Sequence, residues 1–243
     1  MHNALRQQDH RPWPIPEGPW RWRQSWCDLL FAHWKVDAGS LLPGIPEGLE
    51  LDTRDGFAWI GVVPFRMAGV TRRPLPDLPG VSAFPEVNVR TYVTRNGRPG
   101  VWFFSLDATN PLAIWAARRF FHLPYFRADI RIAPLEKGFD YACSRRQDDA
   151  SFEVTFAPAG PVRRAEVGSL EHWLTERYCL YAESRRGQLF KTEVHHEAWP
   201  LQDAIAEFRV SRPGLGLELI GPPDLLHFSK RLDVVAWSPE VVG

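Results

Sequence analysis

Alternating side chains mark one stretch of the chain above all others: Phe84-Pro85-Glu86-Val87-Asn88-Val89-Arg90-Thr91-Tyr92-Val93. Successive residues of a β-strand point to opposite faces, so this stretch separates into two sets. One face carries Glu86, Asn88, Arg90 and Tyr92, and the other carries Val87, Val89, Thr91 and Val93. A strong signal for a two-residue hairpin, Asn96-Gly97, comes just after it. The stretch therefore predicts a strand whose polar face holds an acid, an amide, a guanidinium and a phenol.

The segment that returns from this hairpin is bulky and mostly apolar. Its sequence is Val101-Trp102-Phe103-Phe104-Ser105-Leu106. A run of bulky apolar residues is typical of strands that are covered on both faces. If the two strands pair, the polar face also lies in an enclosed space, where an unpaired charge is costly. We therefore predict a polar pocket built on rigid strands. The alternative is a closed network of internal charges that leaves no cavity.

Composition limits the class of protein. A chain of 243 residues with 44% hydrophobic and 24% charged residues suits one globular domain. We expect this domain to span 17–238, between a flexible N-terminal tail over 1–16 and a C-terminal tail over 239–243. The formal net charge of zero argues against nucleic-acid partners, because such proteins attract phosphate with a basic surface.

Targeting signals and cysteines indicate the compartment. No apolar run reaches the roughly twenty residues that span a bilayer, and the N-terminus lacks the apolar core of a signal peptide. The three cysteines, Cys27, Cys143 and Cys179, have neither metal-type spacing nor the even count of a disulfide framework. These features predict a cytoplasmic protein with no membrane partner.

Local signals place the other elements. Asn110 and Pro111 predict the start of a helix that must end by about Leu123, because Pro124 follows. A second, shorter helix is predicted from Ser169 to Glu176, and a third over 199–208. Strands are predicted over 178–183 and 189–195, and a strand over 57–63 should end at Pro64. Many short strands with a few helices predict an α+β, mainly β fold.

Motifs for cofactors are missing from the sequence. No dinucleotide fingerprint or phosphate-binding loop follows a strand, so no cofactor is expected. His195 and His196 are adjacent, and on a strand they point to opposite faces, so no shared metal ion is expected either. One of the two should face inward, where an imidazole can move protons near neutral pH. Arg177 fits two roles equally: an ion pair with Glu86 or Asp107, or a clamp for a ligand carboxylate.

Five ordered blocks of sequence resemble the YqjF-like family of uncharacterised bacterial proteins, also called domain of unknown function 2071. The blocks are Val63-Pro64-Phe65-Arg66-Met67, the stretch 84–93, Leu123-Pro124-Tyr125-Phe126, Glu176-Arg177-Tyr178-Cys179-Leu180-Tyr181 and His196-Glu197-Ala198-Trp199-Pro200-Leu201. The family is grouped with the acetoacetate-decarboxylase-like fold. The resemblance implies a closed or partly closed antiparallel β-barrel with a few peripheral helices. Homo-oligomerisation follows only by analogy with relatives of this fold.

A more distant resemblance links the chain to acetoacetate decarboxylase itself. In that enzyme an aromatic-x-Glu-Val pattern begins a strand, and the first lysine of Gly-x-Pro-Lys-Lys forms a Schiff base with the substrate. Here Phe84-Pro85-Glu86-Val87 matches the first motif, while Leu123-Pro124-Tyr125-Phe126 falls on the second and lacks both lysines. Because Schiff-base chemistry needs an amine, we expect no lysine-dependent decarboxylation. None of Lys35, Lys137, Lys191 and Lys230 stands in the matching position.

The predicted function is therefore a small-molecule pocket without a Schiff base. The expected catalytic pair is Glu86 and Tyr125, transferring a proton on a carbonyl or organic-acid ligand in a lyase-like or isomerase-like step. Arg90 is expected to hold an anionic group. The expected ligand-binding residues are Arg66, Asn88, Arg90, Tyr92, Phe104, Asp107, Arg177, His195 and His196. Two alternatives stay open: a non-catalytic binding or sensing module, and a structural protein without a pocket. The size of the cavity distinguishes the last from the others.

Overall fold

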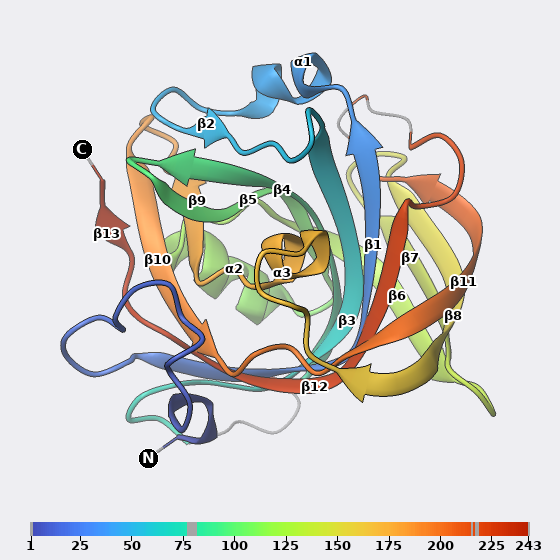
Figure 1. Cartoon of the computed structure of the whole chain (residues 1–243), viewed down its shortest axis with the longest axis horizontal. Coiled ribbons are helices and arrows are strands. Elements are labelled where there is room, and N and C mark those ends of the chain that lie inside the picture. Colours follow the sequence, from blue (N-terminus) through green and yellow to red (C-terminus); the bar gives the residue numbers. More distant parts are fainter. Residues whose placement is uncertain (1, 77–81, 215, 217–218, 243) are drawn as a thin grey trace.

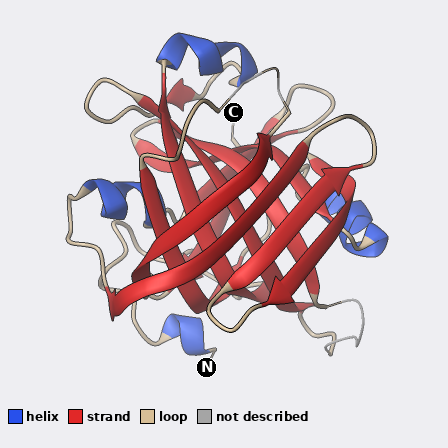
Figure 2. Cartoon of the chain, turned by 90° about the vertical axis from the view of Figure 1, so that its right-hand side faces the viewer, coloured by secondary structure: helices blue, strands red, loops and turns tan. Residues whose placement is uncertain are grey.

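Strands make up most of this protein, whose computed structural model describes residues 2–76, 82–214, 216 and 219–242. One thirteen-stranded sheet curls around on itself, and short helices lie at its periphery (Figures 1 and 2). The strands are β1 (Trp22–Val36), β2 (Glu50–Leu51), β3 (Ala58–Arg72), β4 (Phe84–Arg95), β5 (Arg98–Ala108), β6 (Tyr125–Pro134), β7 (Phe139–Arg145), β8 (Ser151–Arg163), β9 (Cys179–Glu183), β10 (Leu189–His196), β11 (Leu201–Arg212), β12 (Leu225–Ala236) and β13 (Glu240–Val241). The α-helices of the described residues are α1 (Ala38–Leu41), α2 (Pro111–Phe120) and α3 (Leu170–Thr175).

The pairing of the strands forms two circuits that share a wall. One circuit runs β12-β1-β3-β4-β5-β9-β10 and returns to β12; the other runs from β5 through β6, β7, β8 and β11 to the same β12. We call β12, β1, β3, β4 and β5 the shared wall. Only two or three residue pairs join β10 to β12, β11 to β12 and β5 to β9, so the closure is partial. Most pairings are antiparallel, while β5 pairs with β6 and β9 in parallel.

Neighbouring residues of the shared wall belong to two different cores. On β1, Leu29 and Phe31 lie in the first core, whereas Leu30 and Ala32 lie in the second. On β3, Val63 lies in the first core and its neighbour Val62 in the second. The wall is therefore buried on both faces, which explains why its strands read as long apolar runs instead of strict alternation.

The hairpin between β4 and β5 forms at the predicted Asn96-Gly97. Both residues have positive φ, 48° and 72°, as a type I′ turn requires. Further along the hairpin a β-bulge interrupts the register, since Val89 pairs with Ser105 but Arg90 pairs with Phe103. Phe104 is thus the extra residue of β5, and side chains on either side of it change faces.

Two of the three predicted helices are confirmed. The Asn110 side chain accepts hydrogen bonds from the backbone N–H groups of Leu112 and Ala113 at 3.0 and 3.2 Å, which caps α2. Ser169 caps α3 in the same way, by accepting from the N–H of His172 at 3.2 Å. Both caps are local interactions, which is why the sequence alone indicated them.

Two element predictions are wrong. The helix expected over 199–208 is instead β11, which pairs with β8. Its exposure alternates with period two, and Ile205, assigned to a buried helical face, is 64% exposed. The strand expected to end at Pro64 runs through it to Arg72, with Pro64 opposite Val87.

The N-terminal segment lies against the sheet. Ala4 is 1% exposed and packs beside Val235 and Trp237, while the buried Arg11 forms an ion pair with Glu193. The predicted tails also include Met1 and Gly243, which lie outside the described residues. No helix in the described part of the chain is long and apolar enough to cross a membrane.

Candidate functional site

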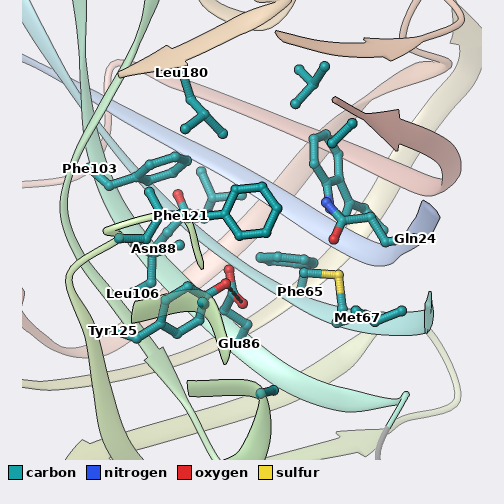
Figure 3. A pocket seen from close by; sticks show the side chains of 18 of the residues that line it. Gln24, Phe65, Met67, Glu86, Asn88, Phe103, Leu106, Phe121, Tyr125 and Leu180 are labelled. Carbon is teal, nitrogen blue, oxygen red and sulfur yellow. Dashed lines mark hydrogen bonds between the residues drawn. The ribbon is translucent and has the colours of Figure 1, made fainter. Parts of the chain in front are cut away.

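A cavity of about 160 Å³ lies within the first core. Its walls come from the shared wall and from β6, β9 and β10, and α2 covers one side with three small residues, Ala113, Ala116 and Ala117. The polar lining residues are Gln24, Glu86, Asn88, Arg90, Tyr125 and Thr192. The aromatic ones, besides Tyr125, are Trp22, Trp26, Phe65, Phe84, Phe103, Phe121 and Trp199. The site is a mainly apolar, aromatic chamber with a few polar groups (Figure 3).

Strand β4 sets the spacing of the polar groups. Glu86 lies opposite Phe65 of β3, and Asn88 lies opposite Val63. Arg90 lies opposite Gly61, where an added Cβ would approach the Arg90 Cγ to 3.3 Å and the His33 ring to 3.2 Å. Since glycine has no Cβ, the side chains of Arg90 and His33 can lie close to the β3 backbone at this point.

Glu86 and Tyr125 form a hydrogen-bonded pair at one end of the cavity. The Tyr125 hydroxyl donates to Glu86 Oε2 at 2.7 Å, and Figure 3 shows the two side chains directed at each other. Glu86 is 1% exposed, and this burial raises its pKa to about 8. Burial, and then the neighbouring Glu86, raise the pKa of Tyr125 well above its usual range. Near neutral pH, Glu86 is therefore a neutral acid that takes up and releases protons close to the working range.

Several polar atoms of the lining have no hydrogen-bond partner in the protein. They are Asn88 Oδ1, Arg90 Nε and Trp199 Nε1. The Arg90 guanidinium lies over the Phe31 ring at 5.2 Å and has no carboxylate partner among the described residues. Buried polar groups are nearly always paired with protein, water or ligand. One acceptor and two N–H donors of the lining residues thus lack a partner within the protein.

Four of the predicted site residues line the cavity together: Glu86, Asn88, Arg90 and Tyr125. Tyr92, from the same strand face, does not line it. Its hydroxyl lies 2.6 Å from His33 Nε2, and its ring packs with Trp59 and Leu174 in a neighbouring cluster.

Phe104, expected at the ligand, does not line the cavity; Phe103 does. The bulge is the reason, because without the extra residue Phe104 would lie opposite Arg90. Phe104 instead packs against the second core. The sequence reads Phe103-Phe104 with no turn residue to mark the bulge, so no local signal distinguished the two.

The other predicted charges are paired outside the cavity. Arg66 donates to Asp28 at 2.9 Å. Arg145 holds Asp107 with two hydrogen bonds, of 2.6 and 2.8 Å.

Arg177 pairs with a residue that neither of its two predicted roles involved. Arg177 is buried and donates to Asp52 at 2.7 Å, and its guanidinium lies over the rings of Tyr92 and Trp173. It therefore pairs with neither Glu86 nor Asp107, and it does not line the cavity.

Neither histidine of the predicted pair lines the cavity. His195 Nε2 donates to the carbonyl of Gln7 at 3.0 Å, and burial lowers its pKa to about 4. His196 Nδ1 donates to the carbonyl of Glu197 at 2.7 Å, and burial lowers its pKa too. Within the described residues, no group of three or more His, Cys, Asp or Glu side chains is arranged to hold a metal ion.

Trp199, like Gln24 and Thr192, is a cavity residue with a polar group that the sequence did not single out. Its backbone N–H donates to Glu176 Oε1 at 2.9 Å, and its indole ring packs on Trp26 and Phe31. The mistaken helix over 199–208 concealed its place in the segment just before β11. Its one signal was its position in the fifth sequence block.

None of the four lysines lines this cavity. Lys230 pairs with Asp28 at 2.6 Å, Lys35 with Asp224 at 3.6 Å, and Lys191 with Glu240 at 3.3 Å. An amine for a Schiff base is therefore missing from the lining.

Comparison with known proteins gives consistent matches. The model of the DUF2071 family, described as an uncharacterized conserved protein, matches residues 23–233. The uncharacterized protein YqjF of Bacillus subtilis (strain 168) is 46% identical over 226 residues, covering 92% of this chain and 93% of that protein.

Solved structures match at lower identity. Acetoacetate decarboxylase from Legionella pneumophila is 16% identical with a TM-score of 0.64, over 97% of this chain and 94% of the enzyme. The enduracididine biosynthesis enzyme MppR, complexed with pyruvate, is 14% identical with a TM-score of 0.63, over 96% and 93%. At these identities the likeness shows the fold, which is the acetoacetate-decarboxylase-like one expected from the sequence.

Proposed function

Since this chain belongs to the DUF2071 family of uncharacterized conserved proteins, as the five sequence blocks predicted, we propose its function from the cavity itself. The protein binds a small carbonyl compound or organic acid there, and Glu86 and Tyr125 transfer a proton on it. The observation that carries this proposal is the buried Glu86, hydrogen-bonded to Tyr125 at 2.7 Å inside a cavity of about 160 Å³.

The step is a proton transfer between carbon and oxygen. Ionised Glu86 takes a proton from the carbon next to the carbonyl. As Glu86 becomes neutral, the single Tyr125 O–H turns from Glu86 to the carbonyl oxygen and stabilises the negative charge that develops there. Glu86 then delivers this proton to the oxygen, or returns it to the carbon, and regains its starting form. No bond is oxidised or reduced. The raised pKa of Glu86 suits the task, because a stronger base removes a carbon-bound proton more readily.

The structural neighbours support the ligand class. One is named for acetoacetate and another was solved with pyruvate, and both compounds are small oxo acids. The chemistry must differ from lysine-dependent decarboxylation, because Tyr125 stands where the resemblance puts the Schiff-base lysine and no lysine lines the cavity.

A non-catalytic binding module is the second candidate. Tyr125 places a phenol where the resemblance puts the lysine amine. A cavity that has lost this nucleophile retains the shape that binds a ligand, which favours the second candidate. The third alternative, a structural protein with no pocket, is disfavoured by the cavity and by the three unpaired polar atoms on its lining.

Hydrogen–deuterium exchange at carbon tests the proton transfer directly. In D₂O, the protein should catalyse loss of the proton signal next to the carbonyl of at least one member of a panel of ketones and oxo acids, followed by NMR. The rate should rise with pH through about 8, because the base is the ionised form of Glu86. Glu86→Gln should lower it by about 100-fold or more.

The control is Glu136→Gln, which changes an exposed carboxyl outside the lining and should leave exchange unchanged. Undiminished exchange in Glu86→Gln would refute the role of this residue. If the wild-type protein binds a compound of the panel but catalyses no exchange, the proton-transfer proposal is wrong and the non-catalytic binding module is correct.

A further inference from the structure

The cavity lining carries an unbalanced positive charge. Among the lining residues, only Glu86 and Arg90 have a carboxyl or a basic side chain. A guanidinium keeps its charge at any pH that a folded protein tolerates. Burial raises the pKa of Glu86 to about 8, so at neutral pH this acid does not neutralise Arg90. A half-buried cation without a counter-charge favours an anionic occupant.

Two residues with an unpaired N–H donor pack on the same ring, that of Phe31. The Arg90 guanidinium lies 5.2 Å from the centre of the Phe31 ring, and the Trp199 ring lies 4.8 Å from the same centre. Arg90 Nε and Trp199 Nε1 both lack a partner. One carboxylate has enough acceptor positions for both donors.

An unpaired acceptor lies between the cation and the acid. Asn88 is 5% exposed, lines the cavity, and its Oδ1 accepts no hydrogen bond from the protein. On β4 it is two residues from Arg90 and two from Glu86, on the same face. An occupant with a hydroxyl next to its carboxylate would donate to this oxygen. The enol form of a 2-oxo acid has this arrangement.

The remaining space is apolar and aromatic. Phe65, Phe103 and Phe121 surround it (Figure 3). A short aliphatic oxo acid would leave much of the 160 Å³ unfilled. An engineered apolar cavity of about 150 Å³ accepts one benzene ring, so a ring of this size suits the chamber. Aromatic walls also favour an aromatic ligand through edge-to-face contacts.

We propose that the occupant is a 2-oxo acid that carries one aromatic ring, with its carboxylate on Arg90 and Trp199 and its enol hydroxyl on Asn88 Oδ1. This inference rests on the proposed function and names its substrate class. Glu86 then carries a proton between the carbon that bears the ring and the carbonyl oxygen, so the keto and enol forms interconvert with no net change in the protein.

Calorimetric titration with four compounds tests the assignment. Phenylpyruvate contains the carboxylate, the carbonyl and the ring. Pyruvate lacks the ring, phenylacetone lacks the carboxylate, and phenylacetate lacks the carbonyl. We expect phenylpyruvate to bind most tightly, with each omission weakening binding by about tenfold or more, the value of one good contact.

Matched variants assign the contacts. Arg90→Gln should weaken phenylpyruvate about tenfold and leave the neutral phenylacetone unchanged. Trp199→Phe keeps an aromatic ring and removes the N–H, so it should weaken the three carboxylates and leave phenylacetone unchanged. Arg127→Gln, at an exposed arginine outside the lining, should change nothing.

The outcomes separate this inference from the proposed function. If pyruvate binds more tightly than phenylpyruvate, and proton exchange still depends on Glu86, the aromatic class is wrong and the proposed function stands. If phenylacetone binds as tightly as phenylpyruvate, Arg90 does not hold a carboxylate. If none of the compounds binds and no oxo acid exchanges its proton, both proposals fail.

Discussion

Glu86 couples the chemistry of the cavity to the stability of the protein. Its pKa is about 8 in the folded chain, compared with an ordinary value of 4.5, because burial disfavours the ionised form. The folded state therefore binds this proton more tightly than the unfolded state does. Consequently, the contribution of Glu86 to stability decreases as the pH rises from about 4.5 to about 8, and then levels off.

Replacement of Glu86 by glutamine should remove this pH dependence. The free energy of unfolding of Glu86→Gln, relative to the wild type, should rise between pH 5 and pH 9, by a total on the order of 3–5 kcal/mol at most. Urea unfolding at several pH values measures the difference, and taking the difference cancels the other titrating groups. Parallel curves for the two proteins would show that Glu86 titrates normally.

At the level of single residues, the alternation of side chains between the two faces of a strand predicted much of the site. Alternation along 84–93 correctly put Glu86, Asn88 and Arg90 on one face. Tyr125 came from the resemblance, and no pattern in the sequence would have brought it next to Glu86. Tyr92 follows the same alternation, yet its ring belongs to another cluster, because the cavity ends before it. Periodicity gives the face of a strand, and the packing of other elements decides how far along that face a cavity extends.

Among the elements, β5 contains one extra residue, Phe104, which determines which of its side chains line the cavity. Phe103→Ala should enlarge the cavity and change ligand affinity, because Phe103 lies opposite Arg90. Phe104→Ala should lower stability by roughly 1–3 kcal/mol, through loss of packing in the second core, and leave affinity unchanged. Thermal unfolding and calorimetric titration of both variants check this pair. Equal effects on affinity would mean that the bulge does not direct the two rings as described.

Elements with local signals were predictable, and those set by pairing were not. The β4–β5 hairpin and α2 each depend on one or two residues, Asn96-Gly97 and Asn110, that act within a few positions. By contrast, Leu201, Ala204, Ile205 and Phe208 satisfy a helical spacing, and their segment became β11 because β8 lies beside it. The bulge at Phe104 has the same origin, since register exists only between two strands.

For the whole molecule, the shared wall should make the two cores unfold together. Leu29 and Leu30 are neighbours on β1 and lie in opposite cores, at 3% and 0% exposure. Leu29→Ala and Leu30→Ala should each lower the stability of the entire protein by about 2–5 kcal/mol. Each should retain one transition in urea, with coincident curves from tryptophan fluorescence and far-ultraviolet circular dichroism. Two separate transitions in either variant would show that the cores are independent.

The place of β12 in both circuits also has a consequence for biosynthesis. This strand begins only at Leu225, yet its partner β1 begins at Trp22. A nascent chain emerging from the ribosome therefore exposes β1 with one long edge unpaired until β12 has been synthesised. Such edges are surfaces that chaperones protect from aggregation. A polypeptide released before Leu225 has been added would have neither circuit closed.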